Sequence, residues 1–262
     1  MTTTRGAPMS SAVRVLEICE ALAEHQPVGV RELARVVDAP RSTVQRALET
    51  LEAAGWALRT DGGVWCLSSR PLLVVARAGV AGALREIARP ALERLHAATD
   101  ESVRLWAREG AGVLIVLSVE SAQPVRYVGP PPGTVLPLHA SAAGKAVLAG
   151  LPPDELDAIL DRPLEALTPH TVVDVRALRA QLREVRARGY ATTRHEARDD
   201  VGGVAAAVVD STGRAVAALS VTLPMHRLTD AIVAEYGALV AAEAAALSAE
   251  YSGATPEGAV RP

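Results

Sequence analysis

Residues 30–56 read VRELARVVDAPRSTVQRALETLEAAGW, and this stretch decides the fold of the N-terminal part of the chain. Apolar residues recur at helical spacing over residues 30–37, and Pro40 then prevents the helix from continuing. A second helical pattern begins near Arg41 and keeps its apolar residues on one face until Gly55 ends it. Two short helices separated by a tight turn form a helix-turn-helix.

The flanking segments extend this motif on both sides. A helical stripe of apolar residues over 10–24 predicts a preceding helix. After the motif, residues 56–59 and 64–67 flank the turn-rich segment 60–63, an arrangement typical of a hairpin. The sequence therefore predicts a winged helix-turn-helix over residues 8–69, in which the hairpin is the wing.

The second helix of the motif carries polar side chains on its first turn and a half that suit the major groove of DNA. Arginine bonds guanine, glutamine bonds adenine, threonine contacts the thymine methyl group, and serine at a helix N-terminus binds phosphate. The alternative is a solvated polar face on which Ser42 caps the helix. We predict DNA contacts from Arg31, Arg41, Ser42, Thr43, Gln45, Arg46 and, in the hairpin, Arg59.

The charge of the whole chain argues against a nucleic-acid binder, but the charge of the N-terminal part does not. The formal net charge is -3. Residues 1–80 carry nine arginines and eight acidic residues, whereas residues 81–262 have a net charge of -4. Residues 30–47 alone carry +2. This small local surplus gives modest attraction to phosphates, so we expect a dimer that reads two half-sites.

From residue 83 onward, strand and helix patterns are mixed, which is typical of an α/β domain. Helices are expected over 83–98, from about Ala140, and over 153–160, 174–188 and 229–249. Strands are expected over 102–108, 113–119, 124–128, 189–194, 203–210 and 215–222, with a short one after the proline-rich 130–133. We predict an α+β protein of two domains, with a linker helix over 70–82, an α/β domain over 83–251 and a disordered tail over 252–262.

Several features set limits on location and chemistry. The two cysteines are far apart in the sequence and have no neighbours at metal-ligand spacing. The first residues lack the apolar core of a signal peptide, and no uninterrupted apolar run is long enough to cross a membrane. The six histidines form no H-x-x-x-H pair, although His139 and His170 could meet in three dimensions. We expect a cytoplasmic protein that binds no metal or cofactor and no membrane.

Two further clusters suggest chemistry, and each has a simpler explanation. The AGK at 143–145 lacks the glycine and the hydroxyl residue that a phosphate-binding loop needs. The start of the helix there could hold a ligand carboxylate beside Ser141, or Ser141 could simply cap the helix. The charged residues at 194–200 could be enlisted in a hydrolase with Ser141 as nucleophile, but no serine lies in a nucleophile elbow. We therefore expect a solvated loop there and no enzyme activity.

Four separated segments give the chain a resemblance to the IclR family of bacterial transcription regulators. They are VRELARVVDAPRSTVQRALETLEAAGW, LHAATDESVRLWAREG, PLHASAAGKAVLAGLP and LREVRARGYATTRHEARDDVGGVAAAVVDSTGRAVAALSVTLPMHRL. The resemblance implies a winged helix-turn-helix, a linker helix and a C-terminal effector-binding domain of GAF-like α/β fold. It also implies homodimers or homotetramers, and control of operons that often serve the catabolism of small organic acids or aromatic compounds.

The resemblance also implies an effector pocket. Carried over position by position, and together with the candidate Ser141, it predicts a pocket formed by Ser141, Ala142, Ala143, Thr193, Val201, Gly203, Ser220 and Thr222. Relatives that bind carboxylates commonly have a cysteine where this chain has Gly203, and an acidic residue can stand where it has Thr193. Both differences make room or remove polarity, which favours a ligand bulkier or more apolar than glyoxylate.

The combined expectation is a transcriptional repressor that responds to a ligand. Its winged domain would read a pseudo-palindromic operator in double-stranded DNA, and its C-terminal domain would bind a small organic or aromatic acid. Two other classes remain open on the residues alone: an enzyme that acts on small molecules through the α/β domain, and a protein-interaction module without DNA contact.

Overall fold

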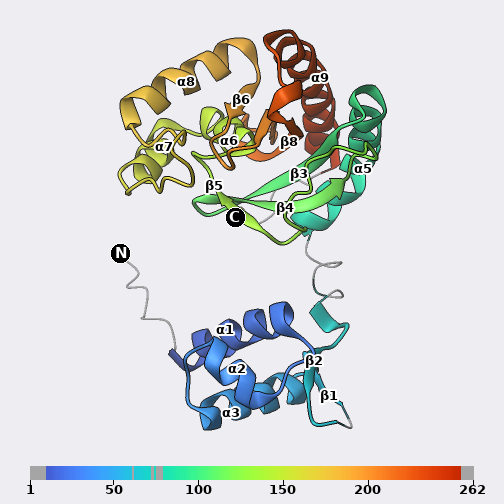
Figure 1. The fold of residues 1–262 in the computed structure, drawn as a ribbon, viewed down its shortest axis with the longest axis vertical. Coiled ribbons are helices and arrows are strands. Elements are labelled where there is room, and N and C mark those ends of the chain that lie inside the picture. Colours follow the sequence, from blue (N-terminus) through green and yellow to red (C-terminus); the bar gives the residue numbers. More distant parts are fainter. Residues whose placement is uncertain (1–9, 61, 72–73, 75–78, 255–262) are drawn as a thin grey trace. The chain divides into compact units, whose positions relative to one another are not determined.

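The described residues form two compact units that divide between Gly79 and Val80 (Figure 1). The computed structural model describes residues 10–60, 62–71, 74 and 79–254, with the backbone alone at 79–83, 253 and 254. We call the two parts the N-terminal unit and the C-terminal unit. Of the expected linker helix, Arg70, Pro71 and Val74 are helical, while residues 72–73 and 75–78 lie outside the described residues.

The N-terminal unit is a winged helix-turn-helix. Its elements are α1 (Ser10–His25), α2 (Val30–Val36), α3 (Arg41–Ala53), β1 (Ala57–Arg59) and β2 (Trp65–Leu67). The two strands pair antiparallel, and Val28 adds a bridge to Trp65. The three predicted helices and the predicted hairpin are confirmed, with ends that differ by one or two residues. Their buried side chains form one core, which includes Ile18, Leu22, Leu33, Leu48 and Trp65.

The turn between α2 and α3 explains why the two helices cross closely. Asp38 has φ of 44°, the left-handed conformation expected for this position. The amide of Ala39 then donates to the carbonyl of Ala34 at 3.1 Å. Pro40 precedes α3, and its carbonyl accepts from the Thr43 and Val44 amides. Ser42 lies inside the helix and does not cap it, so the alternative that made Ser42 an N-cap is wrong.

The C-terminal unit is built on a six-stranded antiparallel sheet in the order β5-β4-β3-β8-β7-β6. The strands are β3 (Ser102–Glu109), β4 (Gly112–Val119), β5 (Val135–Pro137), β6 (Ala191–Arg194), β7 (Val201–Val209) and β8 (Ala215–Pro224). The helices are α5 (Gly79–Thr99), α6 (Ala142–Ala149), α7 (Pro153–Leu160), α8 (Val175–Arg188) and α9 (Asp230–Ala254), with a 3-10 turn, η1 (Met225–Arg227), before α9. The predicted α+β class with two domains is confirmed.

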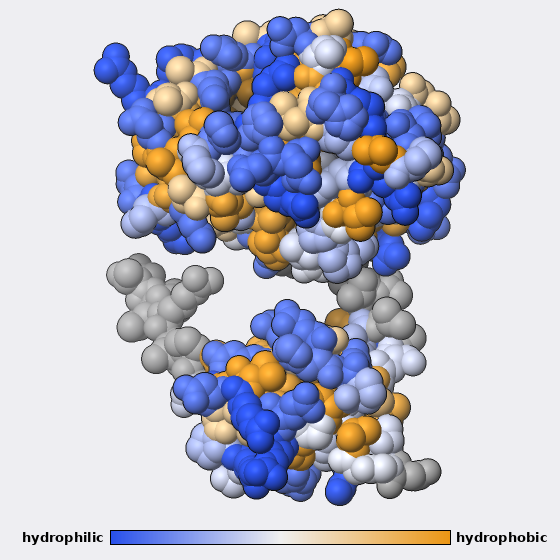
Figure 2. All heavy atoms as spheres, viewed as in Figure 1, coloured by the Kyte–Doolittle hydropathy of each residue, from blue (hydrophilic) through white to orange (hydrophobic). Residues whose placement is uncertain are grey.

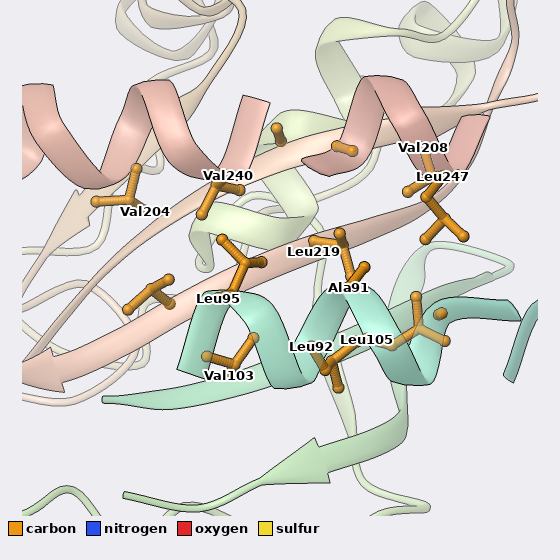
Figure 3. Close-up of a cluster of buried hydrophobic side chains, with 14 of the residues drawn as sticks. Ala91, Leu92, Leu95, Val103, Leu105, Val204, Val208, Leu219, Val240 and Leu247 are labelled. Atoms are coloured by element: carbon orange, nitrogen blue, oxygen red, sulfur yellow. The ribbon is translucent and has the colours of Figure 1, made fainter. Parts of the chain in front are cut away.

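Helices cover both faces of the sheet, so the unit has three layers (Figure 1). Helices α5 and α9 pack on one face, where Leu95 of α5 points toward Val240 of α9 and Leu92 lies beside Leu105 of β3 (Figure 3). Helices α6, α7 and α8 pack on the other face against a second core that includes Trp106. Alternate strand residues therefore belong to opposite cores.

Two sequence expectations fail in the C-terminal unit. Residues 124–128 form a loop, although their apolar and aromatic residues suggested a strand. The place beside β4 is taken by β5, which pairs with residues 112–114. The last helix continues to Ala254, so the first three residues of the expected tail are helical. Residues 255–262 lie outside the described part of the chain.

Helix α9 is, within the described residues, the one helix long and apolar enough to cross a membrane. Its buried side chains, such as Val233, Tyr236, Val240 and Leu247, belong to the core on the sheet. Packing against the sheet therefore accounts for these apolar residues. On the face seen in Figure 2, hydrophobic residues of both units lie in small groups among hydrophilic ones, an ordinary mixture for a protein surface.

Candidate nucleic-acid interface and ligand cavity

Helix α3 divides sharply between a buried face and an exposed face. Val44 and Leu48 are fully buried in the core of the N-terminal unit. Ser42 and Arg46 are exposed on the opposite side, and Thr43 and Gln45 are half-buried on the flanks. The predicted base-reading residues thus share the accessible part of one helix. A role in DNA contact stays a prediction for each of them.

Glu49 belongs to the same exposed face and was missed by the sequence analysis. The Gln45 side-chain amide donates to a Glu49 carboxylate oxygen at 2.6 Å. The spacing of four residues places the two side chains one helical turn apart, which is the signal that could have identified the pair. The Gln45 side chain is thus turned toward Glu49.

The other predicted DNA contacts are arginines with free charge. Arg31 lies exposed on α2, and Arg41 is exposed at the start of α3. Arg59 is exposed on the wing, where its guanidinium lies 5.8 Å from the centre of the Trp65 ring. Across the described residues, neither these three arginines nor Arg46 forms an ion pair. Their charge is available for phosphates or bases.

All eight residues predicted for the effector pocket line one cavity in the C-terminal unit. The cavity encloses about 490 Å³ of empty space, its open mouth included. It lies at the start of α6 and at the adjoining ends of the central strands, on the face of the sheet that α6 covers. The lining comprises Ser141, Ala142 and Ala143 of the α6 start, Thr193 of β6, Val201 and Gly203 of β7, and Ser220 and Thr222 of β8. The structure brings these residues together, and their role in binding stays a prediction.

Seven further residues line the cavity without having been predicted. They are Arg104, Trp106, Tyr127, Pro130, Leu136, Ala197 and Gly202. The first two alternate along β3, so both side chains project from the same face of the sheet. A charged residue in the middle of the apolar strand segment SVRLWA was the signal that could have identified Arg104.

The start of α6 is shaped by a cap and by a glycine. The Ser141 hydroxyl accepts from the Gly144 amide at 3.0 Å, so the predicted capping role of Ser141 is confirmed. A Cβ atom at Gly144 would lie 2.1 Å from the Leu138 carbonyl oxygen, which only glycine avoids. The start of α6 therefore packs closely against the backbone at Leu138.

A side chain at position 203 would project toward the start of α6. A Cβ atom there would lie 3.3 Å from the Val221 carbonyl oxygen and 3.7 Å from the Ala142 Cβ atom. A cysteine at this position would therefore fill part of the cavity beside the α6 start. That glycine at 203 makes room for a bulkier ligand stays a prediction.

Two residues of β3, Arg104 and Trp106, contribute polar side-chain groups to the cavity lining. The Arg104 Nη2 atom donates to both Glu120 carboxylate oxygens, at 2.8 and 3.0 Å. The Trp106 indole donates to the Ser220 hydroxyl at 2.8 Å. The Tyr127 ring centre lies 5.3 Å from the Arg104 guanidinium and 5.3 Å from that of Arg198. Burial raises the pKa of the Tyr127 hydroxyl despite both arginines, so this side chain stays neutral.

Lys145, the single lysine of the sequence, is buried behind the cavity in a charged cluster. Its Nζ atom lies 2.6 Å from both Glu196 oxygens and 2.7 Å from the Gln181 side-chain oxygen. Burial lowers the pKa of Lys145, and the Glu196 carboxylate opposes that shift. The Val172 amide also donates to Glu196. The lysine is thus fully engaged within the protein, in agreement with the rejection of a phosphate-binding loop.

The charged segment 194–200 runs along the cavity, where Ala197 contributes to the lining. Arg194 is tied to the Leu228 carbonyl and to Asp230, and residues 198–200 are exposed. His195 packs beside His170 with ring centres 5.2 Å apart, whereas His139 bonds the Glu165 carbonyl, so His139 and His170 have different partners. Among the described residues, no three side chains of metal-ligating type lie together.

Sequence-family models match both units. The model described as the IclR helix-turn-helix domain matches residues 11–61. The model described as the bacterial transcriptional regulator IclR C-terminal domain matches residues 80–249. Together the two matches span most of the chain.

Individual relatives cover nearly the same extent. The HTH-type transcriptional regulator BhcR of Paracoccus denitrificans is 36% identical over 223 residues, which cover 83% of this chain and 78% of that protein. The acetate operon repressor of Salmonella typhimurium is 31% identical over 250 residues, which cover 94% and 91%. The crystal structure of an IclR homolog complexed with 4-hydroxybenzoate, from Microbacterium hydrocarbonoxydans, superimposes with a TM-score of 0.81 at 25% identity. That match covers 94% of this chain and all of the other.

Proposed function

This chain belongs to the IclR family of bacterial transcriptional regulators, and from that premise we propose that it represses a catabolic or metabolic operon in response to a small organic or aromatic acid. The observation that carries the proposal is that all eight predicted residues, which come from separate segments of the C-terminal unit, line one cavity.

The N-terminal unit supplies the proposed DNA contact. Ser42 and Arg46 of α3 would enter the major groove, flanked by Thr43 and Gln45. Phosphates would be bound by Arg31 and Arg41 of the two helices and Arg59 of the wing. A single copy offers few charges, so we propose a homodimer or homotetramer that spans a pseudo-palindromic operator.

The relatives favour both the sign of regulation and the ligand class. The acetate operon repressor is a repressor by name, and the Microbacterium homolog was crystallised with an aromatic acid. Carried to this chain, these facts support repression that a carboxylic acid relieves. Such a ligand must bind more tightly to the arrangement that releases DNA than to the arrangement that holds it.

Location and enzymatic activity complete the proposal. We propose a cytoplasmic regulator without enzymatic activity, because its relatives are transcriptional regulators. The competing enzyme would turn over a small molecule without DNA. The competing interaction module would show no salt-dependent retention of DNA.

A gel-shift titration tests the proposal. The full chain is mixed with the intergenic DNA upstream of its own gene and of neighbouring genes, at several salt concentrations. We expect one fragment to be retained, with affinity that falls steeply as salt rises. Organic and aromatic acids, beginning with 4-hydroxybenzoate, are then added, and one class should change the retention. Failure of every fragment to bind, or of every small molecule to alter binding, contradicts the proposal.

A further inference from the structure

Arg104 is a buried cation in the wall of the cavity. Only 1% of its side chain is exposed. The neighbouring residues of β3, Val103 and Leu105, point to the opposite core, so the arginine occupies a position that packing alone would give to an apolar residue. Burial of a charge is costly unless every donor finds a partner.

The hydrogen bonds of this guanidinium are incomplete. Its Nη2 atom serves Glu120, whose carboxylate also accepts from Ser102 and Ser118. Its Nε atom, by contrast, is buried and has no hydrogen-bond partner among the described residues. A buried donor left without a partner is unfavourable, and more so when the group is charged. Arg104 also lines the cavity, so its guanidinium borders the space that a ligand would occupy.

The surrounding chain holds the guanidinium in place. A Cβ atom at Gly129 would lie 2.4 Å from Nη2 and 2.8 Å from Cζ of Arg104, so the backbone packs directly against the charged group. The Tyr127 ring contacts it at 5.3 Å. With Glu120 on a third side, the side chain has little freedom to turn its free donor toward water.

We propose that Arg104 binds the carboxylate of the effector through its Nε atom. The guanidinium would then serve two carboxylates, that of Glu120 and that of the ligand, while the apolar body of the ligand lies against Trp106 and Leu136. This inference deepens the proposed function and rests on it, since it takes the cavity to be the effector site. It selects an anionic ligand with an apolar body over a neutral one of the same shape.

Two features of the cavity favour an anion over a neutral acceptor. Hydrogen bonds between a charged donor and a charged acceptor are roughly twice as strong as neutral ones. The N-terminus of α6, at Ser141 and Ala142, borders the same space and adds its positive partial charge. Glu120 opposes the ligand charge but is 46% exposed, so water weakens that repulsion.

Paired probes of equal shape test the charge requirement. Benzoate, 4-hydroxybenzoate and phenylacetate are each compared with their primary amides by calorimetric titration of the full-length protein. Wild-type protein should bind at least one acid about tenfold or more tightly than its amide, in line with a charge-assisted hydrogen bond. Arg104→Gln should abolish that preference. The matched control is Arg108→Gln, an arginine of the same strand that pairs with Glu155 outside the cavity and should keep the preference.

Glu120→Gln provides a second test that survives misfolding of the Arg104 variant. If Glu120 shares the guanidinium with the ligand, removal of its negative charge should tighten acid binding by about threefold or more and leave amide binding unchanged. A merely structural ion pair predicts the reverse, because its loss would loosen the cavity and weaken both probes.

The inference is overturned if no acid of the panel is preferred over its amide, if folded Arg104→Gln keeps the preference, or if Glu120→Gln weakens acid binding. The proposed function stands or falls separately. It survives such a result when a neutral compound, or an acid bound without Arg104, still changes retention of operator DNA in the gel shift. It fails when no compound does so, whatever the probes bind.

Discussion

Arginine serves different purposes in the two units of this protein. In the N-terminal unit, Arg31, Arg41, Arg46 and Arg59 are exposed and, among the described residues, form no ion pair. In the C-terminal unit, eight arginines pair with carboxylates: Arg94, Arg104, Arg108, Arg179, Arg194, Arg198, Arg214 and Arg227. The four arginines predicted to contact DNA thus stay unpaired, although Arg14 of the same unit pairs with Glu17, whereas most of the eight pairs in the C-terminal unit join separate segments.

The contrast shows why net charge is a poor guide to partners. Carboxylates within the C-terminal unit neutralise many of its arginines, so their number indicates little about external ligands. The unpaired arginines of the N-terminal unit keep their full charge for phosphates, although that part of the chain is only weakly basic overall. Substitutions that remove charge should therefore damage folding in one unit and DNA binding in the other.

The largest effect is expected at the buried pair of Lys145 and Glu196. Glu196→Gln removes the charge that compensates the buried ammonium and should lower the free energy of unfolding by about 3–5 kcal/mol. Urea denaturation followed by circular dichroism measures the loss. As a control, Lys145→Met combined with Glu196→Leu removes both charges and should recover much of the stability. A loss below about 1 kcal/mol in the single variant would show that the pair contributes little.

Substitutions on α3 should have a smaller effect, on DNA affinity and not on stability. Arg46→Ala or Gln45→Ala should cost roughly 1–3 kcal/mol of operator affinity and relax the preference for one base pair in each half-site. The unfolding free energy should hardly change, because Arg46 is exposed and makes no ion pair with described residues. Binding to a library of single-base operator variants measures the effect. An equal loss on every sequence would instead identify a phosphate contact.

The carboxylate of Asp210 accepts hydrogen bonds from backbone amides instead of pairing with an arginine side chain. It lies in the turn between β7 and β8, where one oxygen accepts from the Thr212 amide and hydroxyl and from the Arg214 amide. Burial alone would raise the pKa of Asp210, but these hydrogen bonds outweigh burial and lower it. Asp210→Ala should cost about 1–2 kcal/mol of stability near neutral pH.

The contribution of Asp210 to stability should decrease as the pH falls. A carboxyl group whose pKa is lowered by folding stabilises the protein above its unfolded pKa, near 4, and loses that contribution as the pH falls through its folded pKa. The difference between Asp210→Ala and wild type should therefore shrink as acid is added below pH 4. Urea denaturation of both proteins at pH 7 and below pH 4 measures this difference in unfolding free energy. An equal difference at both would contradict the role of the charge.

The smallest effect is expected at an exposed pair of the C-terminal unit. Arg179 and Asp157 are 2.6 Å apart, but their side chains are 38% and 55% exposed. Water screens such pairs, so Arg179→Ala should change the unfolding free energy by about 0.5 kcal/mol or less. DNA affinity should not change. A loss of DNA binding in this variant would contradict the assignment of DNA binding to the N-terminal unit.

Regular elements of this fold were predictable because their patterns are local. The helices α1, α7 and α8 begin and end within about one residue of their expected bounds, since apolar spacing, Pro153 and Gly189 mark them. The segment 124–128 was not predictable as a loop. Its composition suits a strand, but pairing depends on which distant segment occupies the edge beside β4, and that choice is made by tertiary packing.

The cavity was predictable only in part. Family resemblance identified seven lining residues around α6, β6, β7 and β8, the helix start added Ser141, and the structure brings all eight together. It did not identify Arg104 or Tyr127, whose side chains meet across separate segments of the chain. A lone arginine in an apolar strand indicates a buried charge, but its partner Glu120 becomes visible only once β3 and β4 are paired.

The burial of Lys145 has a practical consequence for following the unfolding of the C-terminal unit. It is the only lysine in the sequence, and its side chain is 1% exposed. Amine-reactive reagents should leave this side chain unlabelled in the native protein and modify it only when the unit opens. The rate of labelling at this one site would then report opening directly, without an introduced probe.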